Sequence, residues 1–189
     1  MIKKPHNTPT SRHSFGESDR VRASVAFIRS KTKLRPKIAV ILGSGLGDFT
    51  KTLTQQFTIE VSSIPHYPRL SVEGHHGKIV FGKSGGVSVL AFQGRAHYYE
   101  TGNLETVLYP VRVAKSMGIT TLIVTNAAGG VNESFHAGDL MVITDHINLT
   151  FENPLIGVRP SVTHATIYDE HLRDFIMKSA EQNKILLQQ

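Results

Sequence analysis

Apolar residues gather in two continuous runs, at residues 37–42 (KIAVIL) and 120–125 (TTLIVT). Runs rich in β-branched residues are typical of strands that are buried on both faces of a sheet. Between them, residues 78–82 and 87–92 flank a Gly-Gly turn, and this arrangement predicts a β-hairpin. We therefore predict at least four strands in the first two thirds of the chain.

Two weaker patterns predict further strands. Residues 57–61 suit an edge strand, because a loop with two prolines follows them. Residues 140–144 form a short apolar segment after a glycine-containing turn. We expect each segment to form a strand.

Apolar residues at helical spacing predict helices at residues 18–30, 104–117 and about 169–186. The buried stripe of the last helix is expected to consist of Leu172, Phe175, Ile176 and Ala180. Together, these elements predict an α/β fold, a mixed twisted β-sheet flanked by helices, in a single domain over residues 18–189. Residues 1–17 are polar and lack apolar periodicity, so we expect a mobile tail there.

The composition indicates a soluble globular protein with affinity for anions. The 189 residues are 40% apolar, and 21 Lys and Arg outnumber 15 Asp and Glu. No apolar run is long enough to span a membrane and no hydrophobic signal core begins the chain, so we expect a cytoplasmic protein. The basic residues are scattered without a nucleic-acid-binding motif, so no nucleic-acid partner is expected.

Cysteine is absent, which excludes disulfides and thiolate chemistry. The ten histidines include the pair His75 and His76, which raises the possibility of a metal site. Adjacent residues in an extended turn diverge, however, and the sequence has no His-Glu-x-x-His motif or carboxylate triad. We therefore expect no catalytic metal.

A glycine-rich turn, GSGLG at residues 43–47, follows the first apolar run. Such a turn exposes backbone N–H groups, and with the hydroxyl of Ser44 it would make a phosphate cradle. A dinucleotide site is one alternative, although the spacing is G-x-G-x-G and no strand-end acid follows for a ribose. A tight turn without a ligand is the other alternative.

The stretch LAFQGRAHYYE, residues 90–100, carries a second candidate site. If the chain stays extended past Gly94, side chains alternate between two faces, and Arg95, His97 and Tyr99 project together. A guanidinium fork and an imidazole can place several charge-assisted hydrogen bonds on a phosphate. The alternative is a surface arginine beside a structural histidine.

Small residues also follow the second apolar run, as NAAGG at residues 126–130. In open α/β sheets, ligands bind beyond the carboxyl ends of the strands. We therefore expect the loops after Leu42, Phe92 and Thr125 to converge on one site.

Five motifs in order resemble those of the trimeric purine nucleoside phosphorylases: ILGSGLG, VEGHHGKIVFG, QGRAHYYE, VTNAAGGVN and AGDLMVITDHINLTFENPL. The resemblance spans about residues 21–189. The sister methylthioadenosine phosphorylases share the fold but differ around the arginine-histidine motif. The resemblance implies reversible phosphorolysis, in which a purine ribonucleoside or deoxyribonucleoside and phosphate give free purine and pentose 1-phosphate. It also implies no cofactor besides inorganic phosphate as co-substrate, and a homotrimer.

The resemblance further implies roles for individual residues. Phosphate would contact Ser44, His75, Arg95, His97 and the backbone N–H of Ala127. The nucleoside would contact Tyr99, Asn126, Ala127, Ala128 and Gly129. His97 and Glu100 would be catalytic, with Glu100 bracing His97.

The sequence departs from the family in its second half. Members continue well beyond the helix expected near residue 169, and that part carries the glutamate that binds the purine and the asparagine that helps protonate it. Residues 156–164 replace a longer loop whose phenylalanine reaches a neighbouring subunit. Two hypotheses follow. The chain has the family activity, as part of a longer product or with a second polypeptide, or it is a truncated, catalytically inactive phosphate- or nucleoside-binding remnant. Apolar surface and an unpaired sheet edge would then favour association.

Overall fold

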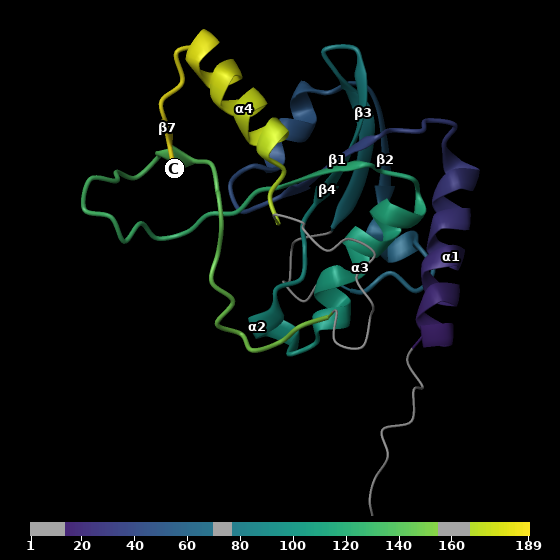
Figure 1. Ribbon diagram of the computed structural model, residues 1–189. Coiled ribbons are helices and arrows are strands. Elements are labelled where there is room, and N and C mark those ends of the chain that lie inside the picture. Colours follow the sequence, from purple (N-terminus) through teal and green to yellow (C-terminus); the bar gives the residue numbers. More distant parts are fainter. Residues whose placement is uncertain (1–13, 70–76, 155–166) are drawn as a thin grey trace, which may run out of the picture. The chain divides into compact units, whose positions relative to one another are not determined.

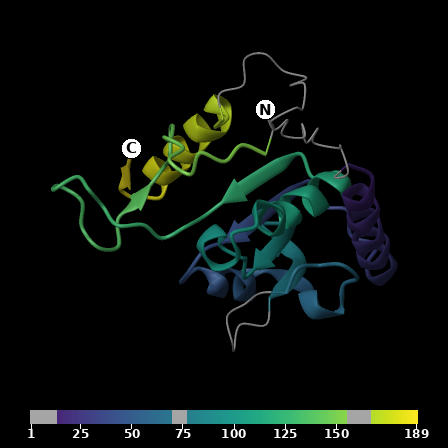
Figure 2. The same cartoon turned by 90° about the horizontal axis from the view of Figure 1, so that it is seen from below.

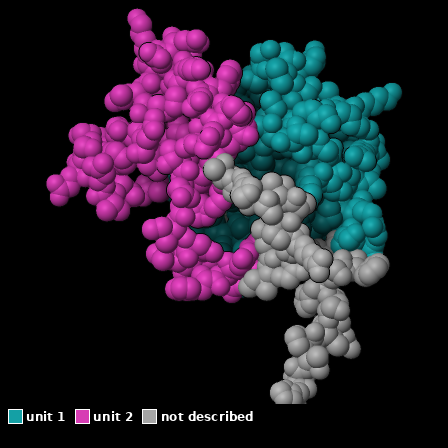
Figure 3. Space-filling model, in the orientation of Figure 1, with its two compact units in different colours: residues 1–127 teal, residues 128–189 magenta. Residues whose placement is uncertain are grey.

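The structure, a computed structural model, describes residues 14–69, 77–154 and 167–189. The chain divides into two compact units, residues 1–127 and residues 128–189 (Figure 3). The single domain predicted over residues 18–189 stays a prediction.

A five-stranded mixed sheet forms the centre of the first unit (Figure 1). Its strands are β1 (Ile38–Leu42), β2 (Thr54–Glu60), β3 (Lys78–Ser84), β4 (Val87–Gln93) and β5 (Thr121–Val124). Their order is β2-β3-β4-β1-β5. Strand β3 is antiparallel to both β2 and β4, whereas β1 is parallel to both β4 and β5. The predicted fold class is confirmed, and the carboxyl ends of β4, β1 and β5 lie at one edge of the sheet.

Two helices share a core with one face of this sheet. They are α1 (Ser14–Lys31, purple in Figure 2) and α3 (Leu104–Ser116). Helix α1 begins at Ser14 rather than at the predicted residue 18, and residues 1–13 of the predicted tail lie outside the described residues. The helix α3 accommodates Pro110, and Asn103 caps it by accepting a hydrogen bond from the Glu105 N–H at 2.9 Å.

A buried hydroxyl ties α1 to its surroundings. Ser24, which is fully buried, donates a hydrogen bond to the Pro65 carbonyl at 2.6 Å. Its Oγ also lies 2.8 Å from the Tyr109 hydroxyl of α3. The two contacts satisfy polar groups that would otherwise be costly to bury.

The other face of the sheet packs a smaller core against the 3-10 helix η1 (Gly47–Thr52) and Leu53. Alternate residues of β1 therefore enter different cores: Ala39 and Ile41 face the helices, whereas Val40 and Leu42 face η1. The central strand is buried on both faces, as its continuous apolar run predicts.

The expectation of a buried strand is wrong for β5. Its residues Leu122, Ile123 and Val124 are 36%, 41% and 56% exposed. The strand lies at the end of the sheet and pairs only with β1 among the described residues. An apolar run identifies a strand that suits burial, but it does not supply the layer that would bury it.

The second unit contains helix α4 (Glu170–Gln182) and the parallel strands β6 (Leu140–Met141) and β7 (Leu187–Gln188). Strand β6 is shorter than the predicted 140–144, and α4 ends at Gln182 rather than near residue 186. The start of the helix is as expected, because the Asp169 carboxylate accepts the Leu172 N–H at 2.9 Å.

The buried stripe predicted for α4 is largely wrong. Leu172, Phe175 and Ile176 are 43%, 69% and 40% exposed, and Ala180 alone of the four is buried. The apolar periodicity of α4 is real, but the described residues of this unit provide no core to receive it. In the described part of the chain, no helix has the length and apolar character needed to cross a membrane.

Candidate functional site

Thr125, directly after β5, connects the loops that follow β1 and β4. Its hydroxyl accepts a hydrogen bond from the Gly43 N–H at 2.9 Å and donates one to the Ile41 carbonyl at 3.1 Å. Its own carbonyl accepts a hydrogen bond from Arg95 Nη1 at 2.7 Å. The loops predicted to converge at the carboxyl edge of the sheet therefore do lie together.

Gly43 allows the close approach of β1 and β5 at this point. A Cβ atom on Gly43 would lie 2.6 Å from the Thr125 carbonyl oxygen and 2.8 Å from Asn126 Cα. Both are backbone atoms, so no side-chain rotation would relieve the clash. The following turn is closed by the Leu46 N–H donating to the Gly43 carbonyl at 3.1 Å, and it presents an exposed Ser44.

The chain does not stay extended as far as Tyr99, so the condition under which Arg95, His97 and Tyr99 would project together is not met. Gly94 has a φ of 92°, which turns the backbone away from the strand direction. After three further residues, the chain enters the one-turn helix α2 (Tyr98–Thr101), which ends at Gly102 with a φ of 57°. His97 itself is still extended, with a φ of -106° and a ψ of 148°, and the alternation of side chains between two faces is lost where the helix begins at Tyr98.

The helical turn brings Glu100 onto His97. Nδ1 of the imidazole lies 2.6 Å from Glu100 Oε1, and the two side chains are 31% and 13% exposed. An extended backbone would have placed them on opposite faces. A carboxylate acceptor favours the tautomer with the proton on Nδ1, which leaves Nε2 as the nitrogen that can contact a ligand.

Tyr99 covers the His97 ring from one side. The ring centroids are 5.0 Å apart and the planes differ by 15°, which is a stacked arrangement. Tyr99 itself is 83% exposed. The imidazole is thus oriented by a carboxylate and a stacked phenol, while the phenol remains accessible.

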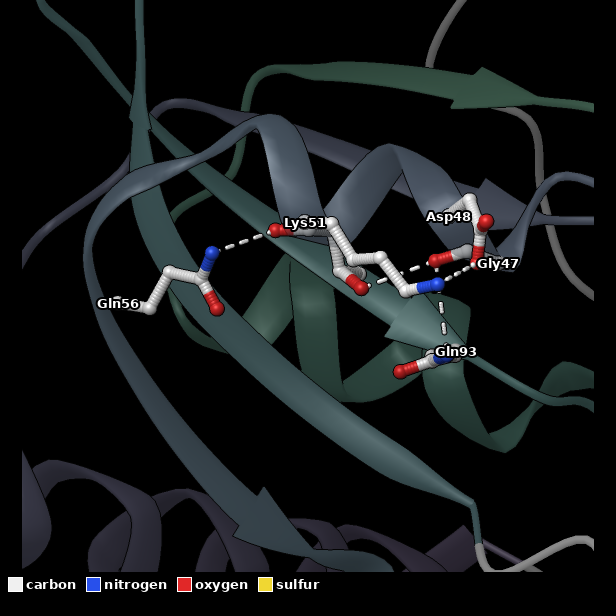
Figure 4. Close-up of polar contacts among 6 residues, drawn as sticks. Gly47, Asp48, Lys51, Gln56 and Gln93 are labelled. Carbon is white, nitrogen blue, oxygen red and sulfur yellow. Dashed lines mark hydrogen bonds and ion pairs between the residues drawn. The ribbon is translucent and has the colours of Figure 1, made fainter.

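A second connection holds η1 beside the end of β4 (Figure 4). The Gly47 carbonyl accepts hydrogen bonds from Thr50 Oγ1 at 2.9 Å and from Gln93 Nε2 at 3.5 Å. Gln56 Nε2 donates to the Thr50 carbonyl at 2.8 Å. The helix η1 is therefore anchored on the last residue of β4, next to the segment that carries Arg95.

The remaining predicted site residues lie in different parts of the chain. Asn126 and Ala127 follow Thr125 and are exposed, and Ala128 and Gly129 are exposed residues of the second unit. His75 lies outside the described residues. Within the residues that the structure describes, no hydrogen bond joins Ser44 to Arg95, and the segments that carry them are connected through Gly43 and Thr125. The roles assigned to all these residues stay predictions.

Sequence reasoning missed the residues that hold the loops together, namely Gly43, Gln93 and Thr125. A signal was present for each. Gly43 directly follows a buried strand, where a close backbone approach is common, and Gln93 and Thr125 are polar residues at the ends of apolar strands. In the described ranges, no three His, Asp or Glu side chains gather closely enough to hold a metal ion.

Ser44, Arg95 and His97 follow strands of a mixed sheet whose parallel strands share one carboxyl edge. The sequence model of the family "Phosphorylase superfamily" matches residues 37–189, and the chain belongs to this family. Its relatives include purine nucleoside phosphorylases. Purine nucleoside phosphorylase 1 of Bacillus subtilis is 46% identical over 178 residues, covering 90% of this chain and 65% of that protein. The enzyme of Rattus norvegicus is 46% identical over 159 residues, covering 81% and 55%.

Solved structures agree with the sequence relatives. The purine nucleoside phosphorylase of Schistosoma mansoni in complex with acetate has a TM-score of 0.80 and 34% identity, covering 90% of this chain and 67% of that one. A purine nucleoside phosphorylase in complex with ribose-1-phosphate has a TM-score of 0.81 at 34% identity, with the same coverage. The chain spans about half to two thirds of the length of the curated relatives it matches.

Proposed function

We propose that this chain acts in the phosphorolysis of purine nucleosides, giving free purine base and (deoxy)ribose 1-phosphate. The observation that carries the proposal is the meeting of the Gly43, Arg95 and Thr125 segments at one sheet edge. The same segments contain the residues that the sequence assigns to phosphate. Relatives named purine nucleoside phosphorylase support the choice of reaction.

The proposed phosphate site has four contributors within the first unit. They are the Ser44 hydroxyl, the Arg95 guanidinium, the His97 imidazole and the Ala127 N–H, and His75 is proposed as a fifth. Arginine suits this task because its planar fork can place two parallel hydrogen bonds on phosphate oxygens. Inorganic phosphate is the proposed co-substrate, and we propose no further cofactor.

The proposed chemistry depends on where the phosphate is fixed. The glycosidic bond breaks through a transition state in which the sugar resembles an oxocarbenium ion. A phosphate held below the anomeric carbon stabilises that cation and then attacks it, so positioning and electrostatics supply most of the catalysis. In this proposal, Glu100 keeps the His97 ring aimed at phosphate, which makes Glu100 a positioning residue.

The nucleoside is proposed to lie against Tyr99, Asn126, Ala127, Ala128 and Gly129. The exposed face of Tyr99 suits contact with a ribose, because aromatic rings combine an apolar surface with a polar edge. We propose a homotrimer and a cytoplasmic location from the family resemblance. The second candidate function is a catalytically inactive phosphate- or nucleoside-binding protein.

A turnover assay tests the proposal. The purified chain is mixed with inosine or guanosine and phosphate, and free hypoxanthine or guanine is measured by chromatography. We expect phosphate-dependent release of base that is lost in Arg95→Met, which keeps the length of the side chain but not its charge. The matched control is Arg20→Met, on an exposed position of α1.

Phosphate binding without base release would reject catalysis by the isolated chain and support the second candidate. A chain that neither releases base nor binds phosphate would reject both functions. Turnover that is equal in Arg95→Met and the unsubstituted chain would reject the proposed phosphate site.

A further inference from the structure

Thr125 directly follows β5, and its N–H, hydroxyl and carbonyl contact the end of β1, Gly43 and Arg95. Its N–H donates to the Ile41 carbonyl at 3.0 Å, and its hydroxyl donates to the same carbonyl at 3.1 Å. The hydroxyl also accepts from the Gly43 N–H at 2.9 Å. Its carbonyl accepts from Arg95 Nη1 at 2.7 Å. No other residue in the described part of the chain bonds to both the turn after β1 and the arginine after β4.

We infer that Thr125 is the positioning residue of the phosphate site, which fixes the Ser44 turn with its hydroxyl and aims the Arg95 guanidinium with its carbonyl. The inference rests on the proposed function, because it concerns the site at which phosphate would bind. Thr125 itself contacts no ligand in this proposal. It sets the spacing between groups that do.

The hydrogen bond from Arg95 to the Thr125 carbonyl determines the direction of the guanidinium. Among the described residues, the bond to Thr125 is the one hydrogen bond that Arg95 makes. Since the guanidinium is planar and carries five N–H donors in a fixed geometry, a bond at Nη1 fixes where the remaining donors point. Without this anchor, a long and half-exposed arginine would sample several rotamers.

The contacts of the Thr125 side chain require a group that both accepts and donates a hydrogen bond. The Gly43 N–H needs an acceptor and the Ile41 carbonyl takes a donor, and a Ser or Thr hydroxyl can serve both. Valine has nearly the same shape as threonine but leaves the Gly43 N–H without its partner. Because Gly43 directly precedes Ser44, loss of this bond frees the turn that would hold phosphate.

The experiment compares Thr125→Val with Thr125→Ser. Affinity for inorganic phosphate is measured by titration calorimetry, and affinity for inosine is measured separately. We expect Thr125→Val to weaken phosphate binding by about tenfold, the effect of one lost hydrogen bond at a site that depends on geometry. Thr125→Ser keeps the hydroxyl and should remain within about twofold of the unsubstituted chain. Inosine affinity should change less than phosphate affinity in both variants.

Amide hydrogen exchange supplies a second measurement that does not need a ligand. The Gly43 amide should exchange faster in Thr125→Val than in Thr125→Ser, whereas amides at the centre of β3 should be unchanged. If Thr125→Val does not fold, Thr125→Ala removes the hydroxyl without placing a methyl group against the Gly43 N–H.

The outcomes separate this inference from the proposed function. Unchanged phosphate affinity in Thr125→Val, or an equally protected Gly43 amide, would overturn the inference while leaving the phosphate site in place. Equal weakening in the Val and Ser variants would also overturn it, because the hydroxyl would then not matter. Failure of the unsubstituted chain to bind phosphate would reject the proposed phosphate site, and the inference with it.

Discussion

Replacement of Gly43 by alanine should disturb the candidate site more than any other single methyl group in the turn. The added Cβ would lie 2.6 Å from the Thr125 carbonyl oxygen, well inside normal contact. To reach ordinary separation, the β1 and β5 ends must move apart by roughly half an ångström or more. Such a shift would lengthen the hydrogen bonds that Thr125 makes with Gly43 and Ile41.

The expected cost has two parts. Forcing an extra carbon into a packed site costs about 1–3 kcal/mol of unfolding free energy. Phosphate affinity should fall by about tenfold or more, because a displacement well below 1 Å already spoils hydrogen bonds that must converge. Urea unfolding measures the first effect, and phosphate titration measures the second.

Gly45→Ala is the matched control in the same turn. Gly45 has a φ of 81° but no atom within 4 Å of its would-be Cβ, so alanine there costs about 1–2 kcal/mol of backbone strain without a clash. The reasoning is refuted if Gly43→Ala binds phosphate as tightly as the unsubstituted chain. It is also refuted if Gly45→Ala loses as much affinity as Gly43→Ala.

Four further predictions follow from other contacts. Glu100→Gln should weaken phosphate binding by about tenfold, since it removes the charge that orients His97. The control Glu105→Gln, which alters an ion pair with Arg112, should leave phosphate affinity unchanged. Equal phosphate affinities in the two variants would contradict this. Ser24→Ala should lower the unfolding free energy by about 1–3 kcal/mol, measured in urea, by leaving buried polar groups unpaired. Burial, with a smaller effect from Tyr109, raises the pKa of the Tyr67 hydroxyl above its ordinary 10.0. The phenol is neutral in both the folded and the unfolded chain below pH 10, so ionisation costs no stability there. As the pH rises past 10, ionisation of the unfolded chain should lower the unfolding free energy by up to about 1.4 kcal/mol per pH unit, and Tyr67→Phe should flatten the loss in urea melts. Val124→Lys should reduce concentration-dependent association in sedimentation, because it places a charge on the exposed edge strand β5; a chain that is already monomeric at high concentration would contradict this.

The sequence predicted most of the first unit because its signals are local. Continuous apolar runs identify β1 and β5, and a Gly-Gly turn identifies the β3–β4 hairpin. The order of the strands placed three loops at one edge, as expected for parallel strands. The apolar periodicity could not predict which other elements would cover each helix or strand. Phe175 of α4 and Val124 of β5 look like core residues in sequence but are exposed.

The site was predicted less completely, for a related reason. The chemistry of Arg95 and His97 identified them as candidates, but the sequence did not predict the helical turn that follows them. The helical turn at α2 depends on Gly94 and Gly102, which both adopt positive φ, and this changes which side chains meet. Thr125 was not recognised because its importance comes from contacts with residues far away in sequence.

The three segments that meet at Thr125 have a consequence for how the protein folds. Thr125 lies 84 residues after Ile41 and 30 residues after Arg95. Contacts between residues this far apart in sequence form slowly and cost chain entropy, so the edge depends on the rest of the sheet being in place. An anion that binds only the completed edge would favour the folded chain by mass action, so phosphate at the proposed site would also stabilise the fold.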